Sequence, residues 1–143
     1  VKKHDKLLLH PLNKEVIVRS IQMQDKDVDL ASTGSRVGLA VKGVEIHALS
    51  RGYILSNADD VISQSSGTIN FKKNPYFPEI KKGKFHITVG LQTVPISISE
   101  INDTRISIVM DKPVVYLPHQ KFLLLDLNAE KLHLMGSGTI TSE

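Results

Sequence analysis

Positively charged side chains gather in one short segment of this 143-residue sequence. The segment Phe71–His86 reads FKKNPYFPEIKKGKFH and contains five lysines and one glutamate. Because an ammonium group pairs readily with phosphate, a basic run of this kind can bind a phosphate-bearing partner. The alternative is a lysine-rich turn in solvent, with the aromatic residues Tyr76, Phe77 and Phe85 in the core.

A second group of charges lies in RSIQMQDKDVDLASTGSRVGL, which spans Arg19–Leu39. Arg19 and Arg36 stand toward the two ends of a segment with three aspartates and one lysine. Such a segment could be an ordinary hairpin. It could equally form the wall of a pocket into which the charges point, and these residues alone leave both interpretations open.

The sequence lacks several motifs that would indicate enzyme chemistry. No phosphate-binding loop with its Lys-Ser/Thr pair is present, and the Asn-Lys-x-Asp guanine-reading motif is also absent. Ser137, in MGSGT, is not followed by the long helix that a nucleophile elbow requires. The six histidines show no metal-ligand spacing; they are His4, His10, His47, His86, His119 and His133.

Composition is that of a soluble globular protein, with 41% hydrophobic and 23% charged residues and a net charge of +3. The absence of cysteine excludes disulfides and thiolate metal sites and fits a reducing cytosol. No apolar run approaches the ~20 residues that span a bilayer, and the N-terminus does not resemble a signal peptide. We therefore expect a cytoplasmic protein without a membrane partner.

Short β-type runs separated by turn residues dominate the chain and predict an all-β fold. The clearest runs in the first part are Glu15–Gln22 and Arg36–Val44, and only Glu45–Arg51 is typical of a helix, of about two turns. The polar segment Ser56–Asp60 predicts a boundary that divides the chain into residues 1–57 and 58–143. The second piece is long enough for a six-stranded barrel. The first, with about four clear strands, is expected to be part of a barrel.

The order of these runs resembles the second and third domains of Tu-type translational elongation factors. Matching features in the first piece are Arg19–Gln22, Gly34–Leu39, Lys42-Gly43 and the Arg51–Leu55 segment RGYIL. In the second piece, KKNPYFPEIKKGKFHITVGLQTVPISI and the closing KLHLMGSGTI resemble the third domain of the selenocysteine-specific branch, in its archaeal type. The resemblance implies two antiparallel β-barrels and covers nearly the whole chain.

Two departures from the family pattern limit what this chain could do. The resemblance implies that the GTPase domain and the first strands of the second domain are missing, which is expected of a fragment of a longer protein. We therefore expect no catalytic residue, no metal site and no cofactor in this chain. GTP and Mg²⁺ would bind in the GTPase domain of the parent protein, which would be one of the partners of this chain.

The family's second domain holds the aminoacylated 3′ end of transfer RNA. The resemblance places Arg36 in the aminoacyl pocket, where the general Tu branch has Asn and the selenocysteine branch has Arg. A guanidinium there suits an anionic aminoacyl group or the 3′-terminal phosphate; the alternative is a surface ion pair with Asp25, Asp27 or Asp29. Arg51 is either a second cation of this pocket or a structural residue of its turn. By the same resemblance, Leu30 stands where the general Tu branch has a Glu beside the terminal adenosine. Its neighbour Asp29 is therefore a candidate residue of the pocket for the 3′ end.

The family's third domain holds the acceptor–T stem, whose A-form backbone is bound by cations and polar donors. The candidates for RNA-backbone binding are Lys72, Lys73, Lys81, Lys82, Lys84 and His86. His86 could instead be a core residue.

The expected function is therefore that of aminoacyl-tRNA-binding domains, with the ribosome as a further partner and without DNA binding. Two other functions remain open. One is an initiator-tRNA factor similar to initiation factor 2 gamma, and the other is a β-barrel protein-interaction module that has lost transfer RNA.

Overall fold

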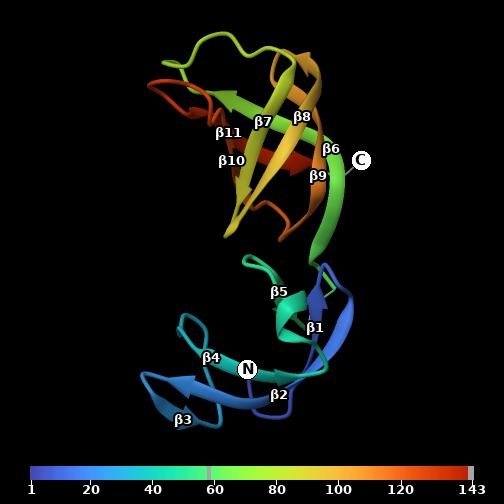
Figure 1. Ribbon diagram of the computed structural model, residues 1–143, viewed down its shortest axis with the longest axis vertical. Coiled ribbons are helices and arrows are strands. Elements are labelled where there is room, and N and C mark those ends of the chain that lie inside the picture. The colour runs from blue at the N-terminus through green and yellow to red at the C-terminus, as the bar shows by residue number, and fades with distance from the viewer. Residues whose placement is uncertain (58, 142–143) are drawn as a thin grey trace. The chain divides into compact units, whose positions relative to one another are not determined.

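The computed structural model describes residues 1–57 and 59–141, which form β-strands for most of their length (Figure 1). The chain divides into two units, residues 1–59 and 60–143, and each has its own hydrophobic core. The predicted all-β fold class is confirmed. The predicted boundary between residues 57 and 58 involves Ala58, which lies outside the described residues.

The first unit is an antiparallel sheet built around one long strand. Its elements are β1 (Lys6–His10), β2 (Lys14–Met23), β3 (Lys26–Val28), β4 (Gly38–Lys42), the 3₁₀ helix η1 (Ile46–Ala48) and β5 (Ile54–Ser56). Strand β2 pairs with β4 along one edge; along the other it pairs first with β1 and then with β3. Strand β5 extends the sheet from β1. Among the described strands these pairings do not close into a ring, as the prediction of a partial barrel requires.

One face of this sheet is buried because apolar residues alternate along its strands. The buried residues are Leu7, Leu9, Val16, Val18, Ile21 and Ala31. The prediction for β2, residues 15–22, agrees with the observed strand. Strand β1 is absent from the prediction because its apolar run, Leu7–Leu9, is too short to separate from a loop.

The helix predicted over Glu45–Arg51 is wrong in length, since only residues 46–48 form one 3₁₀ turn. None of its residues is buried, and the Glu45 side chain makes no capping hydrogen bond. Without an apolar face packed against the sheet, two turns of helix are not stable. No helix in the described part of the chain is long and apolar enough to cross a membrane.

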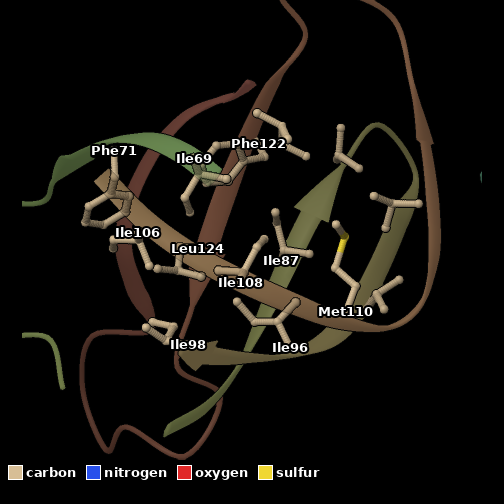
Figure 2. Close-up of a cluster of buried hydrophobic side chains, with 14 of the residues drawn as sticks. Ile69, Phe71, Ile87, Ile96, Ile98, Ile106, Ile108, Met110, Phe122 and Leu124 are labelled. Atoms are coloured by element: carbon tan, nitrogen blue, oxygen red, sulfur yellow. The ribbon is translucent and has the colours of Figure 1, made fainter. Parts of the chain in front are cut away.

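The second unit is a closed six-stranded antiparallel barrel, and its core is drawn in Figure 2. Its strands are β6 (Ile62–Lys73), β7 (Gly83–Val89), β8 (Gln92–Asn102), β9 (Arg105–Tyr116), β10 (Lys121–Leu125) and β11 (Leu134–Thr141). Around the barrel they run β10-β11-β6-β9-β8-β7, and β7 pairs with β10 to close the ring. Ile69, Ile87, Ile96, Ile108 and Leu124 fill the interior, so the alternate positions of each strand face outward.

Candidate nucleic-acid interface

Arg36 lies in the loop between β3 and β4, at an open hollow of about 670 Å³. The opposite wall is the end of β2 and its turn, Gln22–Asp25. The Arg36 side chain is exposed, and no other described residue forms a hydrogen bond or ion pair with it. Its guanidinium group therefore retains all its donors for a ligand that enters the hollow.

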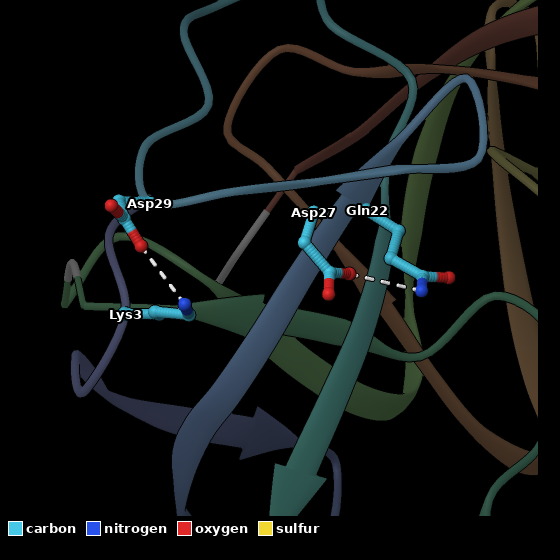
Figure 3. Close-up of polar contacts among 4 residues, drawn as sticks. All are labelled: Lys3, Gln22, Asp27 and Asp29. Carbon is cyan, nitrogen blue, oxygen red and sulfur yellow. Dashed lines mark hydrogen bonds and ion pairs between the residues drawn. The ribbon is translucent and has the colours of Figure 1, made fainter.

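None of the three aspartates near Arg36 in the sequence, Asp25, Asp27 and Asp29, pairs with it among the described residues. Asp29 binds Lys3, with 2.9 Å between its Oδ1 and the Lys3 Nζ, and Asp27 accepts a hydrogen bond from Gln22 Nε2 at 3.0 Å (Figure 3). Asp25 lines the same hollow as Arg36 without an ion pair in the described part of the chain. Among the residues that the structure describes, Arg36 forms no ion pair with Asp25, Asp27 or Asp29.

Asp29 is a surface residue, with 87% of its side chain exposed. Its hydrogen bond with Lys3 and the charge of that lysine lower the pKa of the Asp29 carboxyl, and the same contacts raise the pKa of Lys3. Asp29 does not line the hollow at Arg36. The structure thus gives Asp29 a partner in its own sheet and does not bring it together with Arg36.

Arg51 lies in the turn before β5, where it is exposed. It does not line the hollow at Arg36, and its side chain makes no hydrogen bond to another described residue. Of the three residues predicted for the pocket, Arg36 lines this hollow, and Asp29 and Arg51 do not.

Lys72 and Lys73 end β6 but have different surroundings. Lys73 Nζ donates to the carbonyl oxygens of Asn74, at 3.1 Å, and of Phe77, so it holds the loop that follows the strand. Lys72 is exposed and its ammonium group has no partner among the described residues. Lys72 is therefore the more available of the two for a phosphate.

The basic run in the sequence does not form one stripe on the barrel. Lys84 is on β7, and Lys81 and Lys82 are in the loop before it, whereas Lys72 and Lys73 are on β6. Two strands separate β6 from β7 in either direction around the ring. All five lysines are exposed, but they form two groups on different parts of the barrel surface.

His86 lies on the outward side of β7, opposite Pro95 of β8 and Leu125 of β10, and is half-buried there. The aromatic residues differ from one another. Phe77 is buried and Phe85 packs against the core, as their core interpretation requires, whereas Tyr76 is 87% exposed, so its core interpretation is wrong.

Two cations of the barrel were not predicted as site residues, namely Lys121 on β10 and Arg105 on β9. Strand pairing aligns them in one row, because Thr139 pairs with both Lys121 and Asn70, and Asn70 pairs with Arg105. These residues are far apart in the sequence, and no local pattern indicates their register. The strand order β10-β11-β6-β9 brings them near Lys72.

Comparison with protein-family models finds no match. The chain is 37% identical over 142 residues to the uncharacterized protein MJ0325 of Methanocaldococcus jannaschii. It is 36% identical over 116 residues to the selenocysteine-specific elongation factor of the same organism. These matches cover 98% and 76% of this chain but only 46% and 25% of the relatives, so the chain spans less than half the length of either.

Among solved structures, the chain matches the apo form of translation elongation factor SelB from Methanococcus maripaludis. The TM-score is 0.83 at 24% identity, over 99% of this chain and 37% of that chain, which shows a shared fold. Together with the sequence match, this confirms the resemblance to the second and third domains of selenocysteine-branch elongation factors.

Proposed function

We propose that this chain, which has the two-unit β fold of selenocysteine-specific elongation factors, binds aminoacylated transfer RNA as part of a larger translation factor. The observation that carries the proposal is the 36% identity to such a factor over 116 residues, which include parts of both units. The first unit would hold the aminoacylated 3′ end, and the barrel would hold the stem.

The hollow at Arg36 supports the first of these roles. An exposed guanidinium without a carboxylate partner is poised for an anionic group, since charge-assisted hydrogen bonds are shorter and stronger than neutral ones. The ligand would be an aminoacyl group with a negative side chain, or the 3′-terminal phosphate. The hollow is open to solvent, so screening by salt will weaken this interaction.

Lys72 supports the second role because it is exposed and unpaired. Lys81, Lys82 and Lys84 would contact RNA on a different part of the barrel. Lys73 would act chiefly by shaping its loop. Contacts of these kinds read the A-form backbone and not the bases.

The parent protein would be a GTPase that acts in the cytoplasm on the ribosome. This chain would not be an enzyme, because its residues do not fit GTP: its sequence contains neither the phosphate-binding loop nor the guanine-reading motif. GTP and Mg²⁺ would be held by another domain of the parent.

Binding of one transfer RNA charged with either glutamate or glutamine tests the proposal. The two aminoacyl groups differ little in size, but only glutamate is anionic. The wild-type chain is expected to bind the glutamyl form more tightly, by at least about tenfold, as for a charged hydrogen bond. Arg36→Ala should bind the two forms equally, and Arg36→Lys should retain part of the preference because it keeps the charge without the planar fork.

Arg19→Ala provides the matched control, because Arg19 is an exposed arginine of β2 that does not line the hollow. It should leave the preference unchanged. If the wild-type chain does not distinguish either charged form from uncharged transfer RNA, the proposal fails. A protein-interaction module, which the similarity to MJ0325 leaves open, would then be the better description.

A further inference from the structure

The hollow at Arg36 carries one charge of each sign, on opposite walls. Arg36 contributes a guanidinium group from the loop before β4, and Asp25 contributes a carboxylate from the turn that joins β2 to β3. The other residues that line the hollow have no ionisable side chain; they are Gln22, Met23, Gln24, Ser35, Val37 and Gly38. The hollow is therefore neutral as a whole, but one wall is positive and the other is negative.

These two charges do not neutralise each other. Arg36 and Asp25 form no ion pair, and neither side chain forms a hydrogen bond with another described residue. Both residues are exposed. Each charge is therefore available to a ligand group of the opposite sign, and a charge-assisted hydrogen bond is stronger than a neutral one.

The turn that carries Asp25 holds this residue in a defined backbone conformation. Gln24 and Asp25 are the two central residues of the hairpin turn between β2 and β3, and their φ angles are 48° and 61°. Positive φ at both central positions is typical of a type I′ turn, whose twist matches that of the flanking strands. Aspartate tolerates this conformation well. The turn therefore fixes the direction in which the Asp25 side chain leaves the backbone.

Strand pairing also fixes the two walls of the hollow relative to each other. Gln22 pairs with Asp27 of β3 on one side and with Gly38 of β4 on the other. Its Nε2 atom donates to the Asp27 Oδ1 at 3.0 Å, which ties β2 to β3 beside the turn (Figure 3). Gly38, two residues after Arg36, adds no side chain to the floor of the hollow. The two charges are thus held by paired strands on either side of an open floor.

We infer that Asp25 is a specificity-determining residue of this hollow. Its carboxylate accepts hydrogen bonds from the α-ammonium group of an aminoacyl residue whose anionic side chain binds Arg36. An amino acid that is esterified through its carboxyl group keeps its α-ammonium group, so an acidic one carries a charge of each sign, as the hollow does. A phosphate fits less well, because the Asp25 carboxylate would repel its negative charge.

This inference rests on the proposed function and deepens it, because it adds recognition of a free α-ammonium group to the preference for an anionic side chain. The resemblance assigns no ligand contact to Asp25. The competing interpretation is that Asp25 serves only its turn, where aspartate is a favoured residue. The two interpretations can be separated, because only ligand recognition requires the negative charge of the side chain.

The test compares one transfer RNA charged in four ways: glutamyl, N-acetylglutamyl, glutaminyl and N-acetylglutaminyl. Acetylation removes the charge of the α-ammonium group, and glutamine removes the charge of the side chain, so each charge is varied by itself. Fluorescence anisotropy with labelled transfer RNA gives the affinity of the full 143-residue chain for each form. We expect the wild type to bind the glutamyl form at least about tenfold more tightly than the N-acetylglutamyl form, as for a charged hydrogen bond.

Three variants assign the two preferences to residues. Asp25→Asn removes the charge but keeps the size of the side chain and tolerates positive φ, so the turn should persist. This variant should lose most of the preference for the free α-amino group and keep the preference for glutamate over glutamine. Arg36→Ala should show the opposite pattern. Circular dichroism of each variant checks that the first unit remains folded.

Glu45→Gln is the matched control for Asp25→Asn. Glu45 is an exposed carboxylate of the first unit that makes no capping hydrogen bond and does not line the hollow. Its substitution changes the net charge by the same amount and should change neither preference.

The inference is overturned if Asp25→Asn discriminates against the N-acetylglutamyl form as strongly as the wild type does, since bulk alone would then exclude the acetyl group. It is also overturned, with the proposed function intact, if the wild type prefers glutamate to glutamine but binds the glutamyl and N-acetylglutamyl forms equally. If the wild type binds no charged form more tightly than uncharged transfer RNA, the proposed function fails and the inference fails with it.

Discussion

Single charged residues of the first unit differ in whether the protein already neutralises them. Arg36 has no ion-pair partner among the described residues, whereas the Asp29 carboxylate pairs with the Lys3 ammonium group at 2.9 Å. This difference could not be predicted from the sequence, where three aspartates stand at equal intervals near the arginine. The pairing depends on the N-terminal residues lying beside residues 29–31, as the hydrogen bond from the Lys3 amide to the Asp29 carbonyl shows.

The ion pair of Asp29 and Lys3 predicts how the stability of the fold depends on pH. Because Lys3 lowers the pKa of Asp29 below its ordinary 3.8, the pair stabilises the fold above that pH, and the contribution is lost as pH falls through the lowered value. At the alkaline end it is lost as pH rises through the raised pKa of Lys3, above 10.5. Both groups are exposed, so the effect on stability should be small.

Carbon-detected NMR of the Asp29 carboxyl measures this pKa directly. Lys3→Met should return it to near its ordinary value, whereas Lys14→Met, a control lysine on β2, should not. An Asp29 pKa that is the same in the wild type and in Lys3→Met would contradict the ion pair.

Gln92 is a buried polar residue at the start of β8, 8% exposed, that completes the hydrogen bonding of β9. Its Oε1 accepts from the Val115 amide at 3.0 Å, and its Nε2 donates to the Val115 carbonyl oxygen. Gln92→Ala should lower the free energy of unfolding by about 2–4 kcal/mol, because two buried backbone groups lose their partner. Urea unfolding followed by circular dichroism measures the loss.

The neighbouring Thr93→Ala serves as its control, since Thr93 is exposed and shares a hydroxyl hydrogen bond only with Thr88. It should cost less than about 1 kcal/mol. Equal effects of the two substitutions would mean that the Gln92 contacts contribute nothing specific.

At the scale of elements, strands with a clear alternation were predicted well and short ones were not. Residues 15–22 alternate enough to predict β2, which pairs with three other strands. Strand β1 could not be recognised in the sequence, because it is defined by its pairing with β2 and β5 in the structure. The lysines of residues 71–86 form one run in the sequence, but the strand order of the barrel places the two ends of this run on the non-adjacent strands β6 and β7. Which strands are neighbours in the barrel depends on the strand order, and the spacing of residues in the sequence does not indicate that order.

The close approach of β11 to β6 can be tested by substitution of Gly138. Gly138→Ala should destabilise the barrel by about 3 kcal/mol or more, because its Cβ would lie 1.8 Å from the Asn70 carbonyl oxygen and only backbone movement can relieve the clash. Ser137→Ala, on the outward side of the same strand, should change the stability by about 0.5 kcal/mol or less. Thermal unfolding of both variants compares them. A Gly138→Ala protein as stable as Ser137→Ala would contradict the close approach of β11 to β6.

At the scale of the whole molecule, the chain consists of two units with separate cores. The family resemblance predicted both units because their motifs occur in a fixed order along the chain. What the sequence could not indicate is which cations lie together, since Lys72, Arg105 and Lys121 come from three strands. We therefore propose different ligands for the two units: the first unit would bind the aminoacylated 3′ end, and the barrel would bind the RNA backbone of the stem.

The lifetime of the aminoacyl ester of transfer RNA, measured with and without the chain, tests binding of the aminoacylated 3′ end most directly. A protein that binds the aminoacylated 3′ end covers part of the ester and hinders the attack of water on it. We expect excess wild-type chain to slow hydrolysis of glutamyl-tRNA several-fold, and the Arg36→Ala variant to protect the ester less. An ester lifetime unchanged by the wild-type chain would contradict the binding of aminoacylated transfer RNA by this chain.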